Sequence, residues 1–218
     1  MALLLDNDVV EKLAQLDLLP EAKNLLKTKF GELMILETLK YKLCPVKESK
    51  RKKRNPIVTS RIEEFIKEDI IEINCIVEDD DLIEALTING LDAGEMQLLQ
   101  ALFQPENEIL MTGDKRFLEA LAQVDFLEEK LKQINGCMIC FEQIIYFLII
   151  ELGFETIKSK VIQVLESDIP IDTALRACFG SKHLAVQETV IDSLNSYINN
   201  LRKNSGHLLS ISKEWTPQ

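Results

Sequence analysis

Residues 3–10, Leu-Leu-Leu-Asp-Asn-Asp-Val-Val, contain the change of pattern that decides the fold. The first three are an apolar run typical of a short buried strand, and apolar residues then recur at helical spacing from Val9 onward. Strands and amphipathic helices go on alternating along the chain, and further strands are predicted at 70–76, 108–112 and 137–141. This alternation predicts a parallel sheet covered by helices on both faces.

A helix is predicted at residues 32–43, because Leu36, Leu39 and Leu43 share one helical face. More helices are expected after the last strand, at 143–152, 156–166, 172–178 and 184–201. We therefore predict an α/β protein with three α/β/α layers, a central parallel sheet and added C-terminal helices. One domain would span 1–180 with a basic loop insertion at 47–56, a helical extension would cover 181–203, and a frayed, flexible tail would cover 204–218.

The composition is that of an ordinary globular protein. The 218 residues are 46% hydrophobic and 28% charged, which excludes collagen-like, low-complexity and wholly disordered chains. Five scattered cysteines do not form a disulfide framework and favour a reducing compartment. The N-terminus lacks the basic region of a secretory signal, and the apolar runs are shorter than a membrane span. We expect a cytoplasmic protein without a membrane partner.

Charge is segregated along the sequence. The formal net charge is -11, which disfavours nucleic-acid binding over most of the surface. Residues 47–54 nevertheless have a local charge of +5, which leaves -16 on the remainder. We expect an exposed loop whose phosphate-binding candidates are Lys50, Arg51, Lys52, Lys53 and Arg54. A solvated charge run without a ligand is the alternative.

Carboxylates follow the predicted strands and begin the predicted helices. Asp6 comes directly after the first strand, Asp114 follows the strand at 108–112, and Asp92 and Glu95 begin a helix. Each fits helix capping, and the segments starting at Asp8 and Asp92 both have capping-box spacing. However, the carboxyl ends of parallel strands meet at one edge of a sheet. Several carboxylates gathered there would repel one another, and such a cluster usually implies a bound cation.

The order of these segments resembles that of the PIN-domain nucleases. The carrying residues are Leu-Leu-Asp-Asn-Asp-Val-Val at 4–10, Asp-Ala-Gly-Glu-Met at 92–96, and Ile-Leu-Met-Thr-Gly-Asp-Lys at 109–115. The last two segments are the most specific, and the similarity extends over roughly residues 1–180. The resemblance implies a parallel sheet flanked by helices and an acidic cluster that binds Mg²⁺ or Mn²⁺ for phosphodiester hydrolysis.

The resemblance also implies roles for single residues. Asp6, a helix-borne Glu37, Asp92 and Asp114 would be the catalytic metal ligands, and Asp8 and Glu95 would be additional ones. By helical periodicity alone, Glu32 is an alternative to Glu37. Oxygen ligands of this kind suit a hard divalent cation that activates water and neutralises charge on phosphate.

Two hypotheses follow for the function. The first is a Mg²⁺- or Mn²⁺-dependent ribonuclease acting on single-stranded RNA. The second is a non-catalytic, PIN-like regulatory protein, as in toxin–antitoxin systems, whose acidic surface binds a basic partner. A homodimer and a protein inhibitor are kept as candidate partners.

Overall fold

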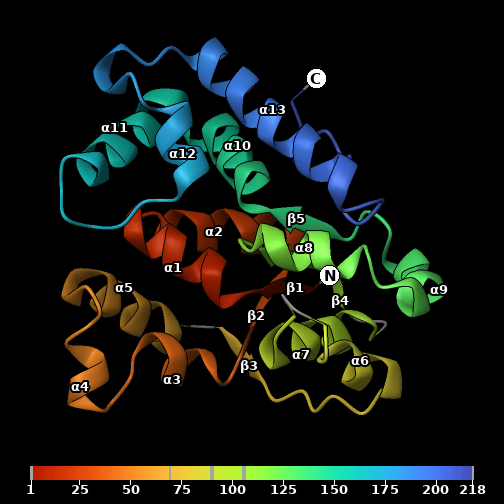
Figure 1. The fold of residues 1–218 in the computed structure, drawn as a ribbon. Helices are drawn as coiled ribbons and strands as arrows, with labels where there is room; N and C mark the ends of the chain where they lie inside the picture. Colours follow the sequence, from red (N-terminus) through yellow and green to blue (C-terminus); the bar gives the residue numbers. More distant parts are fainter. Residues whose placement is uncertain (1, 69, 89–90, 105–106, 218) are drawn as a thin grey trace.

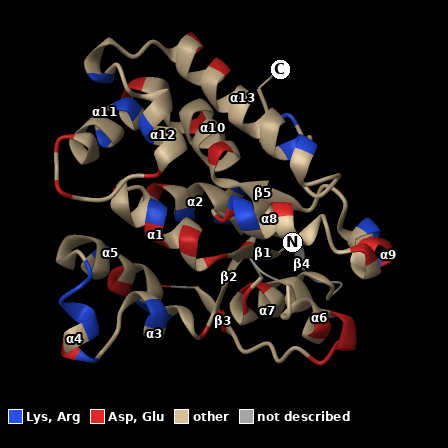
Figure 2. Cartoon of the chain, in the orientation of Figure 1, with Lys and Arg blue, Asp and Glu red and all other residues tan. Residues whose placement is uncertain are grey.

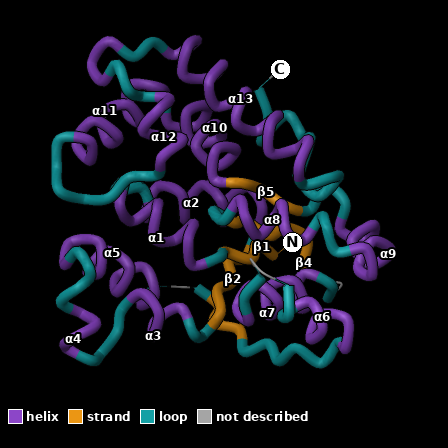
Figure 3. Tube along the Cα trace, in the orientation of Figure 1, coloured by secondary structure: helices purple, strands orange, loops and turns teal. Residues whose placement is uncertain are grey.

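The computed structural model describes residues 2–68, 70–88, 91–104 and 107–217. Five strands form one all-parallel sheet in the order β3-β2-β1-β4-β5, which lies in the centre of the molecule (Figures 1 and 3). The strands are β1 (Ala2–Leu5), β2 (Glu32–Leu36), β3 (Ile71–Ile73), β4 (Asn107–Thr112) and β5 (Met138–Cys140). The predicted α/β class with a central parallel sheet is confirmed.

Helices cover both faces of this sheet, because successive side chains of a strand point to opposite sides. Leu3 and Leu5 of β1 belong to one apolar cluster, and Leu4 belongs to the other. The first cluster is completed mainly by α1 (Asn7–Gln15), α2 (Leu19–Phe30), α3 (Leu39–Leu43), α5 (Pro56–Lys67), α10 (Phe141–Leu152), α11 (Phe154–Leu165) and α12 (Thr173–Cys178). The second is completed mainly by α6 (Asp80–Ala85), α7 (Ala93–Leu102), α8 (Lys115–Leu121) and α9 (Glu128–Leu131).

The remaining elements are short, except for one long helix. α13 (Gln187–Asn204) contributes residues to both apolar clusters. The short ones are α4 (Glu48–Arg51) and the 3₁₀ turns η1 (Asp125–Leu127), η2 (Lys132–Ile134) and η3 (Lys182–Leu184). None of the helices within the described ranges is both long and apolar enough to cross a membrane.

The helix predicted at 32–43 is wrong in its first part. Residues 32–36 form β2, which pairs with β1 on one side and β3 on the other, and only Leu39–Leu43 is helical. Leu33 and Ile35 face one apolar cluster while Leu36 faces the other, which is the alternation of a strand. The leucine spacing that predicted one continuous helix therefore spans the end of β2, a turn and α3.

The tail predicted to be frayed is also different in the structure. Gly136 donates its N–H to His207 O, Met138 donates to Leu208 O, and Ser210 donates to Met138 O, at 2.8–3.0 Å. Trp215 is only 2% exposed, and its ring centroid lies 4.9 Å from that of Phe30 and 4.8 Å from that of Phe147. The segment 205–217 thus covers the β5 edge of the sheet and packs into the core.

Candidate metal centre

Asp6 lies at the carboxyl end of β1 and is buried, with 8% of its surface exposed. Its N–H donates to Met111 O at 2.9 Å, which holds the ends of β1 and β4 together. The carboxylate accepts a hydrogen bond from the Thr112 hydroxyl at 3.1 Å and makes no capping bond to α1. Burial raises the pKa of Asp6 to about 6, and the charge of Asp8 adds to the shift.

Asp114 follows β4 at the same edge. Its Oδ1 accepts from the N–H groups of Arg116 and Phe117 at 2.8 and 3.3 Å, so the predicted role as N-cap of α8 is confirmed. Asp8 lies on the first turn of α1, half-exposed, with Oδ2 3.7 Å from Lys12 Nζ. The capping box expected from Asp8 is absent, because the N-cap position of α1 is Asp6.

Asp92 and Glu95 form the capping box predicted at the start of α7. Asp92 Oδ1 accepts from Glu95 N–H at 2.9 Å, and Glu95 Oε2 accepts from Asp92 N–H at 2.7 Å. Burial raises the pKa of Glu95 to about 8. The charges of Asp92, Asp114 and Asp6 act in the same direction, and the bond from Asp92 N–H opposes them. These four carboxyl groups therefore lie within electrostatic reach of one another.

The resemblance had implied that Glu37 lies on a helix. In the structure it lies directly after β2. Leu5 pairs with Ile35, so Asp6 and Glu37 follow neighbouring strands at the same end. Glu37 N–H donates to Ile73 O at 3.0 Å, which holds its backbone there. Glu32 pairs with Ala2 at the opposite end of β2. At the rise of a β-strand, it lies about 13 Å along the strand from Leu36. Of the two glutamates left open by the sequence, only Glu37 is on the side of Asp6.

We call the group of carboxylates at the carboxyl ends of the strands, Asp6, Asp8, Glu37, Asp92, Glu95 and Asp114, the acidic edge. Lysines from α3 border it. Lys42 Nζ lies 3.6 Å from Asp92 Oδ2, and its charge lowers the pKa of Asp6, against the larger effect of burial. Both partners of the Lys42–Asp92 pair are about half exposed, so water and salt screen the interaction. Figure 2 shows the blue of Lys and Arg on α3 and on the neighbouring α4.

The basic segment 47–54 is exposed, as predicted, although part of it forms the short helix α4. Some of its cations are paired with glutamates, Arg51 with Glu63 at 3.2 Å and Lys52 with Glu48 at 2.8 Å. Arg54 connects the segment to α1 and α3, the two helices beside the acidic edge. It pairs with Glu11 of α1 at 2.6 Å and donates to the carbonyl of Lys42 at 3.0 Å.

Two cavities lie along the outer side of α1 between the acidic edge and the basic segment. One of about 260 Å³ is lined in part by Asp8, Lys12 and Asp172. The other, of about 100 Å³, is lined in part by Lys53 and Arg54. Both include Glu11, Gln15 and Pro170 in their walls, so they adjoin each other. The hollowed surface thus runs from Asp8 and Lys12 to Lys53 and Arg54 of the basic segment.

The donor chemistry of this edge suits a hard divalent cation, since it consists of carboxylate oxygens. As the side chains stand, no group of three or more His, Cys, Asp or Glu in the described part of the chain is arranged to hold a metal ion. One oxygen each of Asp92, Glu95 and Asp114 is turned to a helix N-terminus. Ligation would use their other oxygens together with the carboxylate of Asp6, which caps nothing.

Three residues of this region escaped prediction from the sequence. Thr112 holds Asp6, Lys12 contacts the turn before Asp114, and Asp172 pairs with Lys12 at 3.1 Å. Thr112 lay inside the quoted Thr-Gly-Asp-Lys motif, and its position one strand away from Asp6 was the available signal. Asp172 carried no signal, because its approach to Lys12 depends on how the C-terminal helices pack.

No protein-family model matches this chain, and neither curated proteins nor solved structures show a significant match to it.

Proposed function

We propose that this protein is a Mg²⁺- or Mn²⁺-dependent nuclease that hydrolyses phosphodiester bonds, with single-stranded RNA as its substrate. The proposal rests on the PIN-like order of the motifs and on one structural observation. The carboxylate of Asp6 is buried at the edge of a parallel sheet where the chain also brings Glu37, Asp92, Glu95 and Asp114. A buried carboxylate beside other acids is costly unless a cation joins them.

The residues would divide the work as follows. Asp6, Glu37, Asp92 and Asp114 would hold the ion, and Asp8 and Glu95 would extend the ligand set. The bound ion would activate water and neutralise charge on the phosphate. Thr112 orients Asp6. The cations at 50–54 would attract the phosphate backbone to a surface that is otherwise acidic.

Calorimetric titration with Mn²⁺ tests the metal site. We expect the wild type to bind the ion and the variant Asp6→Asn/Asp114→Asn to lose binding. The variant Asp168→Asn/Asp192→Asn is the matched control, since it removes the same charge from two exposed positions. Equal heats from the wild type and the Asp6/Asp114 variant would contradict the proposal.

Cleavage of end-labelled single-stranded RNA tests turnover. We expect cleavage with Mn²⁺ or Mg²⁺, none with EDTA, and none from Asp6→Asn/Asp114→Asn. Metal binding without cleavage of RNA or single-stranded DNA would favour the regulatory alternative, for which the acidic remainder of the chain suits a basic partner. A homodimer and a protein inhibitor stay predictions.

A further inference from the structure

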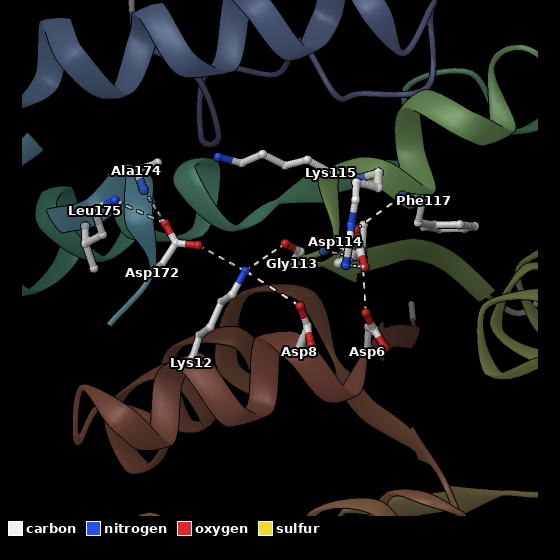
Figure 4. A network of polar contacts seen from close by, with 12 residues as sticks. Asp6, Asp8, Lys12, Gly113, Asp114, Lys115, Phe117, Asp172, Ala174 and Leu175 are labelled. Atoms are coloured by element: carbon white, nitrogen blue, oxygen red, sulfur yellow. Dashed lines mark hydrogen bonds and ion pairs between the residues drawn. The ribbon is translucent and has the colours of Figure 1, made fainter. Parts of the chain in front are cut away.

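Lys12 of α1 joins three separate parts of the fold beside the acidic edge (Figure 4). Its Nζ donates to Gly113 O at 2.7 Å and lies 3.1 Å from Asp172 Oδ2 and 3.7 Å from Asp8 Oδ2. The ammonium also lies 5.3 Å from the ring centroid of Phe141. The Lys12 side chain is 17% exposed and that of Asp172 is 12% exposed, so this pair is held within the protein.

The carbonyl that Lys12 binds belongs to the peptide between Gly113 and Asp114. The N–H of that same peptide donates to Thr112 Oγ1 at 3.1 Å. The Thr112 hydroxyl has a single proton, which it donates to Asp6 Oδ2 at 3.1 Å. One peptide plane is therefore fixed at its oxygen by Lys12 and at its nitrogen by Thr112, and the same hydroxyl orients Asp6.

Gly113 permits this close approach. A Cβ at this position would lie 3.0 Å from Lys12 Nζ and 3.1 Å from the Cβ of Asp8. Any larger residue would push Lys12 or the turn away. The contact between α1 and the turn after β4 therefore depends on the absence of a side chain here.

Asp172 holds Lys12 from the opposite side. Its Oδ1 accepts from the N–H groups of Ala174 and Leu175 at 2.9 and 3.1 Å, which fixes the carboxylate at the start of α12. Burial opposes ionisation, but the charge of Lys12 and the N–H donors hold the pKa of Asp172 below its usual value. A charged pair fixed at both ends is a rigid support for the peptide that it contacts.

We propose that Lys12 and Asp172 are positioning residues that orient the Gly113–Asp114 peptide and, through Thr112, the carboxylate of Asp6. The C-terminal helices would thereby set the geometry of the acidic edge from outside it. The inference rests on the proposed function, because Asp6 and Asp114 are its candidate ligands. Groups that orient metal ligands commonly change metal affinity by about 10- to 100-fold when they are removed.

The decisive variant is Lys12→Met/Asp172→Asn. It removes one positive and one negative charge, so the net charge near the acidic edge is unchanged, and the amide oxygen of the substituted side chain can still cap α12. Lys12→Met alone would leave Asp172 buried without its partner and risks unfolding. Lys160→Met is the control for the loss of a lysine contact, because Lys160 also links a C-terminal helix to the α1 region, through Asp17, and its side chain is about as buried as that of Lys12.

The first measurement is amide hydrogen exchange in the metal-free protein. We expect exchange of the Asp114 N–H to accelerate about fivefold or more in the double variant, since the peptide that carries this N–H is no longer held at its carbonyl oxygen. The Glu95 N–H, bound to Asp92, should not change and is the internal reference. Lys160→Met should leave both amides unchanged. An Asp114 amide that exchanges at the wild-type rate would overturn the inference.

The second measurement is the Mn²⁺ affinity. We expect the double variant to bind Mn²⁺ about 10- to 100-fold more weakly than the wild type, and Lys160→Met to bind it equally well. Lys12→Arg keeps the charge and the donors, so its loss of affinity should be smaller than that of the double variant. If wild type and double variant bind Mn²⁺ equally, the positioning role is wrong. If the wild type binds no Mn²⁺, the proposed function fails, and the exchange of the Asp114 amide alone decides the inference.

Discussion

The hydroxyl of Thr112 lies 3.1 Å from Asp6 Oδ2 and joins the ends of β4 and β1 inside the protein. In this contact a neutral donor supports a carboxylate that is surrounded by other acids. Among the ion pairs of the described residues, none includes Asp6. The acidic edge therefore stores electrostatic free energy that depends on pH.

Replacing Asp6 with Asn should stabilise the metal-free protein at high pH. Because the folded pKa is raised to about 6, the contribution of Asp6 to stability is complete below pH 4 and is lost as the pH rises through 6. At pH 8, Asp6→Asn should raise the free energy of unfolding by about 1–3 kcal/mol, and at pH 4 by almost nothing. Urea unfolding in EDTA measures both values. Equal gains at the two pH values would show that charge is not the cause, and Asp168→Asn is the exposed control.

The two roles of Asp92 can be separated by substitution. Asp92→Asn keeps an oxygen that can accept from Glu95 N–H, so the stability should change by less than about 0.5 kcal/mol. Asp92→Ala removes the cap and should cost about 1 kcal/mol. Both should weaken Mn²⁺ binding if Asp92 is a ligand. Urea unfolding and calorimetry on the same samples distinguish the roles, and equal destabilisation by Asn and Ala would argue against capping by the Oδ1 atom.

The basic segment should contribute to the salt dependence of RNA binding. The variant Lys50→Ser/Lys52→Ser/Lys53→Ser retains Arg54, which ties the segment to Glu11, and should keep the fold. If these lysines contact phosphates, the slope of log K against log salt should fall by about 2. Binding of labelled single-stranded RNA at several salt concentrations measures the slope. The control is Lys182→Ser/Lys203→Ser/Lys213→Ser, which removes the same charge at exposed positions far along the chain. Identical slopes for the two variants would indicate that the segment is a solvated charge run that binds no RNA.

Trp215 should be essential for stability. Its ring contacts Phe30 of α2 and Phe147 of α10, so Trp215→Ala would leave a large cavity and cost about 3–5 kcal/mol. Ile211→Ala, in the same segment but 80% exposed, should cost little. Chemical denaturation compares the two variants. A loss below about 1 kcal/mol for Trp215→Ala would mean that the segment is dispensable.

The layers of this fold were predictable because local pattern and tertiary structure agree. Residues 3–5 form a strand buried on both faces, and the apolar run before Asp6 indicates this directly. The placement of Asp6 and Asp114 at the same end of the sheet was likewise predictable, because each follows such a run and parallel strands have their carboxyl ends on one side. The capping role of Asp92 followed from its spacing to Glu95.

What failed depended on contacts that no local pattern contains. The segment 32–36 is a strand because β1 and β3 flank it, although its leucines also fit a helix. The sequence did not single out Lys12, because its contact with Asp172 depends on how α12 packs against α1. Trp215 gave no sign of burial in a polar tail, because its partners Phe30 and Phe147 are far away in the sequence.

The pairing of the tail with β5 also bears on the order of folding. Met138 and Leu209 form a parallel bridge although 71 positions separate them, so the bridge closes a long loop that contains α10 to α13 and is expected to form late. Until then, any intermediate with the five strands formed would present β5 as an open edge, which is where chains self-associate. Refolding yield at rising protein concentration should therefore be governed by the docking of residues 207–210.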